Sequence, residues 1–280
     1  MKGTVKNILK FLKVYHPLQS FYRNAIFNYQ RKRNRKNYSS YKGAGFTCNV
    51  CNEKYTQFVP DYPSEENRQA IDNNKIVAGY GENIFCPNCM STARERLLIA
   101  KLAEFDLKDK EVLHLSPEKN IYHFIKAKAH VTTADLLPGF YKTIDGMVQK
   151  QDATHFSYAD NRFDLVIANH ILEHIPDDKK AMSEIYRVLK PGGSAILQVP
   201  YTEYLDETIE IPGINDPAKQ SFLFGQKDHV RIYLLGDYVS RLQQAGFRAE
   251  IIPYAALEKY YPFAIQQHEC FIDISKPISA

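Results

Sequence analysis

The chain has 280 residues, which is enough for one α/β domain and a smaller appendage. Its composition, 44% hydrophobic and 24% charged, is that of a globular protein and excludes fibrous and disordered classes. No apolar run approaches the roughly 20 residues of a membrane-spanning helix. The first twenty residues are basic but lack the apolar core of a signal peptide, so we expect a cytoplasmic protein.

The formal net charge of +4 conceals an asymmetry along the chain. Residues 1–42 contain 11 of the 36 Lys and Arg residues and no Asp or Glu. The other 25 basic residues are outnumbered by the 32 acidic ones, so the rest of the chain has a net charge of −7. A basic arm on an acidic body predicts that the arm meets an anionic surface.

Two helices are predicted in this arm, which we define as residues 1–42. The first has apolar residues at Val5, Ile8, Leu9 and Leu12, and the second runs from Leu18 to about Tyr29. A basic run at residues 31–36 follows, of the kind that binds lipid or nucleic acid phosphates. Three interpretations stay open: packing of the arm on the body, peripheral association with an anionic membrane, and RNA binding.

Two CxxC pairs follow the arm, Cys48 with Cys51 and Cys86 with Cys89. Two such turns can supply the four thiolates of a closed, structural Zn²⁺ site. The 34 residues between the pairs need order of their own, and residues 58–60 and 76–80 are candidate strands. The alternatives are two reduced dithiols or a redox pair. We expect a zinc-ribbon-like module over residues 43–92.

Strands and helices alternate in the following part of the chain. Strands are predicted at residues 111–115 and 130–135, with a weaker one at 147–152. The stretch from Arg162 to Val199 then reads as a buried strand, an amphipathic helix, a stop at Pro191-Gly192-Gly193, and a second buried strand from Ala195. Strand, helix and strand predict a crossover in a parallel sheet.

This stretch, with its FDLV strand, LEH turn and RVLKPGG helix end, resembles the second half of a class I S-adenosylmethionine-dependent methyltransferase of type 11. The resemblance implies a Rossmann-like, seven-stranded α/β domain over residues 93–280. Cys86-Pro87-Asn88-Cys89 and the following SxxRERLL segment also resemble the junction of a bacterial subfamily in which a zinc ribbon precedes this domain.

The resemblance also implies a set of residues that bind S-adenosyl-L-methionine. Residues 116–120, after the first strand, contain no glycine, which departs from the family pattern. A carboxylate that ends the second strand can accept both ribose hydroxyls, and a later one can accept from the adenine amine. The predicted cofactor residues are Leu115, Ser116, Glu118, Asp135, Leu136, Asp152, Ala153, Asn169 and His170.

The acceptor side is expected after the fifth strand. Residues 201–227 read as an irregular substrate lid, and Asp228-His229-Val230-Arg231 follows it. We predict that His229 removes a proton from the acceptor and that Arg231 orients an anionic group, with hydrogen bonding inside the lid as the alternative. His174 is assigned to packing and Glu173 to a local cap or ion pair.

The leading interpretation is an enzyme that methylates an oxygen of a small-molecule or glycan acceptor. An RNA methyltransferase is the first alternative, although the chain has neither an Asn-Pro-Pro-Tyr-like turn after the fourth strand nor a Pro-Cys nucleophile. The second alternative is a non-catalytic binding or scaffold protein, motivated by the loop without glycine. Neither the acceptor nor the oligomeric state is predicted.

Overall fold

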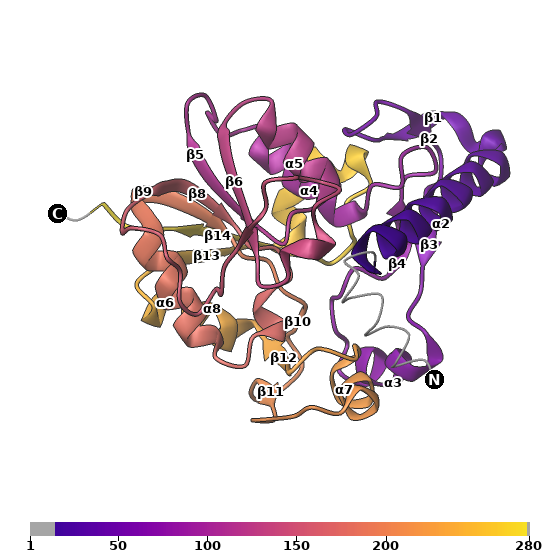
Figure 1. Cartoon of the computed structure of the whole chain (residues 1–280). Coiled ribbons are helices and arrows are strands. Elements are labelled where there is room, and N and C mark those ends of the chain that lie inside the picture. The colour runs from indigo at the N-terminus through magenta and orange to yellow at the C-terminus, as the bar shows by residue number, and fades with distance from the viewer. Residues whose placement is uncertain (1–14, 279–280) are drawn as a thin grey trace.

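A mixed seven-stranded sheet forms the centre of the molecule in the computed structural model, which describes residues 15–278 and their side chains from residue 25 onward (Figure 1). The strand order is β13-β14-β9-β8-β5-β6-β7. Five strands are parallel, and β14 is antiparallel to both of its neighbours. The strands are β5 (Glu111–Leu115), β6 (His130–Asp135), β7 (Gln149–Lys150), β8 (Phe163–Ile167), β9 (Leu189–Ile196), β13 (Arg248–Ile252) and β14 (Phe271–Ser275).

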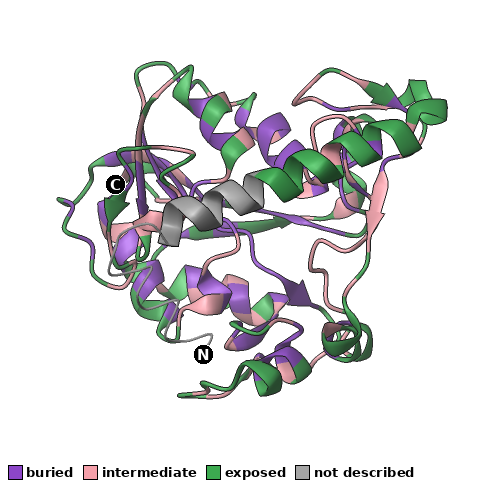
Figure 2. Ribbon diagram, turned by 45° about the vertical axis from the view of Figure 1, so that its right-hand side comes forward, coloured by how far each residue is buried: buried purple, intermediate pink, exposed green. Residues whose placement is uncertain are grey.

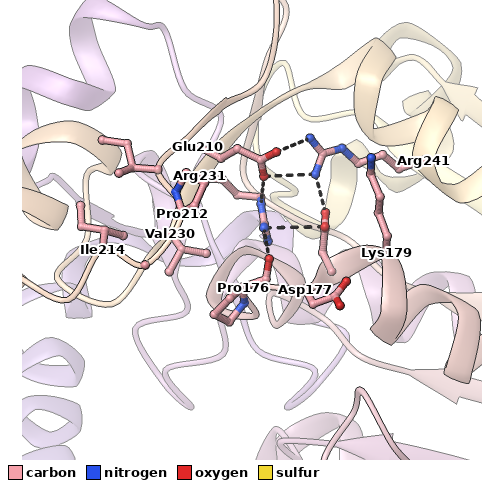
Figure 3. Close-up of a pocket in the computed structure, with 12 residues that line it drawn as sticks. Pro176, Asp177, Lys179, Glu210, Pro212, Ile214, Val230, Arg231 and Arg241 are labelled. Atoms are coloured by element: carbon pink, nitrogen blue, oxygen red, sulfur yellow. Dashed lines mark hydrogen bonds and ion pairs between the residues drawn. The ribbon is translucent and has the colours of Figure 1, made fainter.

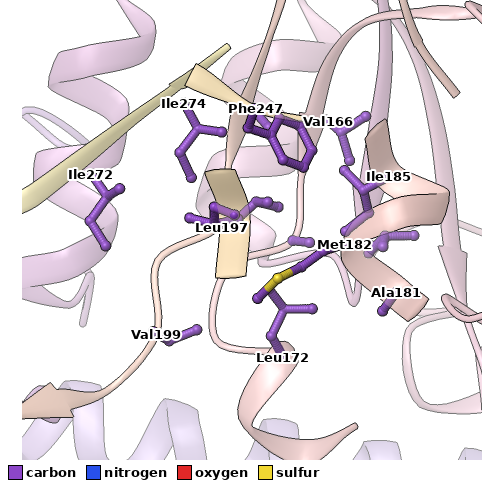
Figure 4. Close-up of a cluster of buried hydrophobic side chains, with 14 of the residues drawn as sticks. Val166, Leu172, Ala181, Met182, Ile185, Leu197, Val199, Phe247, Ile272 and Ile274 are labelled. Atoms are coloured by element: carbon purple, nitrogen blue, oxygen red, sulfur yellow. The ribbon is translucent and has the colours of Figure 1, made fainter. Parts of the chain in front are cut away.

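Helices cover both faces of this sheet. Successive residues of β8 point to opposite faces, so that Val166 packs with helices α6 and α8 whereas Leu165 and Ile167 pack with α4, α5 and η4. Figure 4 shows the first of these two cores, in which Met182 and Ile185 of α6 meet Leu197. The bounds are α4 (Ala93–Leu102), α5 (Lys119–Lys126), α6 (Asp178–Val188), α8 (Leu235–Gln244) and η4 (Tyr254–Phe263). The predicted Rossmann-like fold class is confirmed.

The predicted end of the crossover helix is wrong in its position. Helix α6 ends at Val188, and β9 begins at Leu189, so Pro191, Gly192 and Gly193 lie inside the strand. The pairing of β9 with β8 shifts register there, and Gly192 has a φ of +77°. A bulge accommodates a proline and a left-handed glycine, which explains how a helix-breaking sequence became part of a strand.

The insertion that we expected to be irregular, residues 201–227, contains regular elements and forms an ordered unit with residues 231–234. The strands β10 (Tyr201–Thr202), β11 (Ile209–Glu210) and β12 (Arg231–Leu234) make a small sheet, and helix α7 (Pro217–Phe224) follows β11. Helix α3 (Glu65–Asn73), which comes from the segment between the CxxC pairs, packs on α7 (Figure 1). The two insertions therefore support each other.

The CxxC pairs lie in a separate small core with two antiparallel strand pairs, β1 (Lys42–Thr47) with β2 (Lys54–Tyr55), and β3 (Val59–Asp61) with β4 (Gly81–Phe85). The candidate strand at residues 58–60 is close to β3, but the one at 76–80 is wrong, because only Val77 forms a bridge there, to Tyr201. Short helices η1 (Ser39–Tyr41), η2 (Pro138–Phe140) and η3 (Leu172–His174) complete the fold.

Helix α2 (Tyr15–Asn37) is longer than the predicted second helix of the arm and includes the whole basic run. It lies along the outside of the molecule, and most of its described side chains are exposed (Figure 2). Arg31 and Arg35 both donate to the backbone carbonyl of Asn88, at 2.8 and 3.1 Å. Part of the basic run thus holds the helix against the second CxxC turn. The helix predicted around residues 5–12 lies outside the described residues.

Candidate active site

A pocket of about 700 Å³ opens at the carboxyl ends of β5, β6 and β8. Open α/β sheets bind ligands at this edge, next to the point where the chain reverses its direction of strand addition, here between β5 and β8. Seven of the nine predicted cofactor residues line the pocket, namely Leu115, Ser116, Asp135, Leu136, Asp152, Ala153 and His170. Leu137, Phe140, Tyr141 and Thr154 also line it and were not predicted.

The loop without glycine still adopts a backbone that glycine would favour. Ser116 has a φ of +44° directly after β5, and its amide donates to the carbonyl of Ala134 at 2.9 Å. The Ser116 hydroxyl donates to Asp135 at 2.5 Å. A left-handed, non-glycine residue at a strand end is a form of strain that functional sites often retain. The loop therefore makes a left-handed turn at the end of β5 without a glycine.

Asp135 ends β6 and points into the pocket. Besides the Ser116 hydroxyl, it accepts the amide of Leu137 at 2.6 Å, and this bond orients the carboxylate. Asp152 lies at the same rim, exposed, and accepts from the amide and hydroxyl of Thr154. These bonds lower the pKa of Asp152. Both carboxylates can accept hydrogen bonds from a ligand in the pocket.

Neither Glu118 nor Asn169, the other two predicted cofactor residues, lines this pocket, and the two contact each other. The Asn169 amide donates to both Glu118 carboxylate oxygens at 3.3 Å, and its own oxygen is buried without a partner. Burial, reinforced by the charge of Glu95, raises the pKa of Glu118 to about 7. A carboxyl group in this state ionises more readily when a cationic ligand approaches.

A second cavity, of about 180 Å³, adjoins the first, because His170 and His174 line both. It lies between the main domain and the two insertions, and Tyr80, Arg94 and Gln226 also line it. Three histidines gather in it around Glu173, which is 1% exposed. The Oε1 atom of Glu173 lies 3.4 Å from His170 Nδ1 and 4.0 Å from both His174 Nε2 and His229 Nε2.

The electrostatics of this group follow from its burial. Burial by itself raises the pKa of Glu173, but the hydrogen bond from His170 and the nearby imidazoles hold it at about 2. Burial, helped by the charge of Arg94, lowers the pKa of His170 to about 4. At neutral pH the group is therefore one buried carboxylate among imidazoles. Glu173 pairs locally with His170 and His174, which was one of the two roles predicted for it, whereas the assignment of His174 to packing missed this arrangement.

Arg231 lies elsewhere, in a third pocket of about 400 Å³ (Figure 3). Its guanidinium donates to the backbone carbonyls of Leu172, Ile175 and Pro176, and it pairs with Glu210 at 3.0 Å. Arg241 pairs with Glu210 as well, at 3.1 Å. Arg231 is 3% exposed and its donors are occupied, so the structure gives it a role in fastening β12 to η3.

The four cysteines of the CxxC pairs are brought together in the small core. Their sulfur atoms all lie within 4.8 Å of one another, with Cys48 to Cys89 at 3.6 Å and Cys51 to Cys86 at 3.7 Å. Tetrahedral Zn²⁺ with Zn–S bonds of about 2.3 Å requires sulfur atoms about 3.8 Å apart. The donor set and its spacing therefore fit this ion.

Arg96 connects this core to the main domain. It is fully buried and donates to five backbone carbonyls, those of Asn83, Ile84, Ser91, Phe263 and Ala264. Burial lowers its pKa to about 10, which still leaves it charged at pH 7. All five acceptors are backbone oxygens, so Arg96 joins the cysteine module to the main domain. Arg94 points instead into the second cavity.

A doubly wound α/β domain with a ligand pocket at its switch point is thus joined to a four-cysteine module. Residues 102–197 match a family model described as a methyltransferase domain. Phosphoethanolamine N-methyltransferase 2 of Caenorhabditis elegans is 44% identical over 46 residues, 16% of this chain and 10% of that protein. Demethylmenaquinone methyltransferase of Lactiplantibacillus plantarum is 43% identical over 49 residues, 18% of this chain and 21% of that protein.

The chain therefore spans about a tenth to a fifth of the length of these two relatives. Among solved structures, phosphoethanolamine N-methyltransferase 2 of Haemonchus contortus in complex with S-adenosyl-L-methionine has a TM-score of 0.45 at 17% identity. That match covers 66% of this chain and 52% of the other. Among the helices that the structure describes, none combines the length and apolar character needed to span a bilayer.

Proposed function

We propose that the protein is an S-adenosylmethionine-dependent methyltransferase that acts on an oxygen of a small-molecule or glycan acceptor. The observation that supports it best is the pair of adjoining cavities, one with the residues predicted to bind the cofactor and one with imidazoles, which meet at His170. The match of residues 102–197 to a methyltransferase domain points in the same direction.

On the donor side, the proposed contacts are those that the sequence resemblance implies, and the position of Asp135 and Asp152 in the lining of the larger cavity supports two of them. Asp135 accepts the ribose hydroxyls, which replace the Ser116 hydroxyl as its partners. Glu118 pairs with the ammonium group, and Asp152 accepts from the adenine amine. The bound cofactor supplies an electrophilic methyl group. The residues of this chain align it with the acceptor, and alignment accounts for much of the rate of such a displacement.

On the acceptor side, the cavity between the two insertions offers imidazoles. His229 lies there 6% exposed, and burial lowers its pKa, so the ring is neutral at pH 7 and able to accept a proton. Residues 201–227 act as the lid, and residues 62–80 form the opposite wall. The four cysteines hold a structural Zn²⁺ that keeps this wall attached.

Replacing Asp135 with asparagine tests the donor side. Because a hydrogen bond to a charged group contributes about 1.5–3 kcal/mol, Asp135→Asn is expected to weaken S-adenosylmethionine binding by about 10- to 100-fold in calorimetry. Asp273→Asn, at an exposed position on β14, is the matched control and keeps wild-type affinity. If the zinc-loaded wild type binds no S-adenosylmethionine, the proposal fails and a scaffold role becomes the better account.

The acceptor is tested by offering labelled S-adenosylmethionine with separate glycan, lipid, small-metabolite and RNA fractions. Label in the glycan or small-metabolite fraction supports the proposal. Label in RNA alone would replace it with the RNA methyltransferase alternative, for which the exposed basic residues Lys32, Arg33 and Lys36 of α2 provide a phosphate-binding surface. Peripheral membrane binding through residues 1–42 stays a proposal, tested by vesicle binding with and without these residues.

A further inference from the structure

We propose that Glu173, His174 and His229 form a binding site for a divalent first-row transition metal ion, which receives the acceptor oxygen beside the cofactor pocket. The inference rests on the proposed function for the identity of the bound oxygen but not for the metal site itself. Two imidazoles and one carboxylate with open positions are a common donor set for such ions. Ligand atoms of these three residues all lie within 4.8 Å of one another.

The position of Glu173 supports the site. Its side chain is 1% exposed, and among residues 25–278 no Lys or Arg nitrogen lies within 4 Å of its carboxyl group. Its Oε1 atom faces the three imidazoles, whereas its Oε2 atom has no hydrogen-bond partner. A buried carboxyl group with an unsatisfied oxygen is costly, and a bound cation removes that cost.

His174 and His229 both direct a ring nitrogen toward Glu173. His174 Nδ1 lies 3.2 Å from the backbone carbonyl of Asp228, so this nitrogen carries the proton and Nε2 presents its lone pair toward Glu173. The His229 ring is hydrogen-bonded by the backbone carbonyl of Phe224, while its Nε2 also faces Glu173. Histidine ligands of metals usually donate their other ring nitrogen in this way, which fixes the tautomer and the ring plane.

The distances between the carboxylate oxygen and the two imidazole nitrogens are close to those that a metal ion requires. Metal bonds of about 2.0–2.2 Å allow two ligand atoms to be at most about 4 Å apart. The Glu173 oxygen is 4.0 Å from each of the two Nε2 atoms, at the upper limit, so a small inward rotation of the side chains completes the site. His170 Nδ1, at 3.4 Å from the same oxygen, holds the carboxylate in place.

The position of the site gives the ion a chemical role. His174 lines both cavities, so an oxygen bound to the ion lies at their junction. With the ion bound, His229 would be a ligand rather than the proton acceptor, and the ion would act as a Lewis acid that promotes loss of the acceptor hydroxyl proton to a water molecule in the cavity. The oxygen then attacks the methyl carbon, an O–C bond forms as the S–C bond breaks, and the electron pair of that bond stays on sulfur. No oxidant or reductant is needed.

Mn²⁺ titration of the zinc-loaded full chain, followed by electron paramagnetic resonance with and without S-adenosylmethionine, tests the site. Mn²⁺ prefers oxygen and nitrogen donors and competes poorly for thiolates, so it should not replace Zn²⁺ at the four cysteines. The expected stoichiometry is about one Mn²⁺ per chain, with at least a tenfold loss of affinity in Glu173→Gln and His229→Gln. His123→Gln, an exposed histidine on α5, is the control and keeps Mn²⁺.

Folding is checked by zinc content and S-adenosylmethionine affinity, which His229→Gln should retain because His229 does not line the cofactor pocket. His174→Gln, at a side chain 31% exposed, provides a variant that the fold tolerates if the buried ones fail. Absence of Mn²⁺ binding in the wild type, or unchanged binding in the folded variants, overturns the metal site. Mn²⁺ binding without S-adenosylmethionine binding would leave the metal site standing and remove the proposed function.

Discussion

Glu118→Gln is expected to abolish a pH dependence of S-adenosylmethionine binding that the wild-type carboxyl group creates. Glu118 is half-buried, and burial, followed by the charge of Glu95, raises its pKa from 4.5 to about 7. Pairing with the ammonium group of the cofactor requires the ionised form. Below pH 7 a proton must therefore leave before the complex forms.

The size of the effect follows from that pKa. A carboxyl group with a pKa of about 7 that must ionise on binding weakens the affinity about 11-fold at pH 6 but only about 1.1-fold at pH 8. The wild type should thus bind about tenfold more tightly at pH 8 than at pH 6, a difference of about 1.4 kcal/mol. At pH 7 about half a proton is released for each cofactor bound.

Calorimetry at pH 6, 7 and 8, in buffers with different ionisation enthalpies, measures the affinity for S-adenosylmethionine and the number of protons released on binding. Glu118→Gln should bind more weakly than wild type at pH 8, and the ratio of the two affinities should be about tenfold smaller at pH 6. Glu250→Gln, at an exposed position on β13, should keep the wild-type slope. His170, with a pKa of about 4, does not titrate in this range. A flat wild-type profile, or an unchanged slope in Glu118→Gln, would refute the reasoning.

The raised pKa of Glu118 also makes the stability of the cofactor-free protein depend on pH. Because the folded-state pKa of Glu118 lies above its ordinary value, this group stabilises the fold fully below pH 4.5, and the contribution is lost as the pH rises through 7. The upper limit of the loss is about 3 kcal/mol. Glu118→Gln removes this pH-dependent contribution. The free energy of unfolding in urea should therefore change less between pH 5 and pH 8 in the variant than in the wild type.

Two further predictions concern the cysteine module. Cys86→Ser should lower the zinc content from about one ion per chain to near zero, whereas Cys270→Ser, at the fifth cysteine, should keep it. Elemental analysis measures the zinc content. Equal zinc in both variants would contradict the Cys₄ site. Arg96→Met should lower the free energy of unfolding by about 4 kcal/mol, because several buried carbonyls lose their donor. Urea unfolding tests this against Arg68→Met, an exposed arginine on α3 expected to change stability by about 0.5 kcal/mol or less. A loss below about 1 kcal/mol in Arg96→Met would show that water replaces its hydrogen bonds.

The central sheet could be predicted from the sequence because its strands are continuous apolar runs. The predicted ranges for β5 and β6 agree with the structure. The range for β9 is wrong at its start, since local signals cannot distinguish a helix stop from a bulge inside a strand. Which of the two forms depends on the neighbouring strand β8.

The residues of the cofactor pocket could be placed because they follow strands, and the carboxyl ends of parallel strands share one edge. Their detailed partners could not be predicted. Asn169 and Glu118 are 51 positions apart in the chain and meet only because β5 and β8 are neighbours. Their assignment to S-adenosylmethionine stays a prediction.

The acceptor cavity depended most on the tertiary structure. The spacing of His170, Glu173 and His174 is visible in the sequence, but their relation to His229 depends on how β12 packs on η3. The segment between the CxxC pairs shows no sign of its role in the sequence, yet it reaches the lid through Val77 and Tyr201.

The order of apolar runs, the two CxxC pairs and the RVLKPGG segment by themselves determined the fold class, the grouping of the cysteines and the edge of the sheet where ligands bind. These features are local, because periodicity and short-range spacing depend only on the geometry of one helix, strand or turn. Only the tertiary structure decided that Arg96 and Arg231 bind backbone carbonyls and that Glu173 is buried among three histidines. The reason is physical: burial and the pKa of a group depend on neighbours that are distant in the chain.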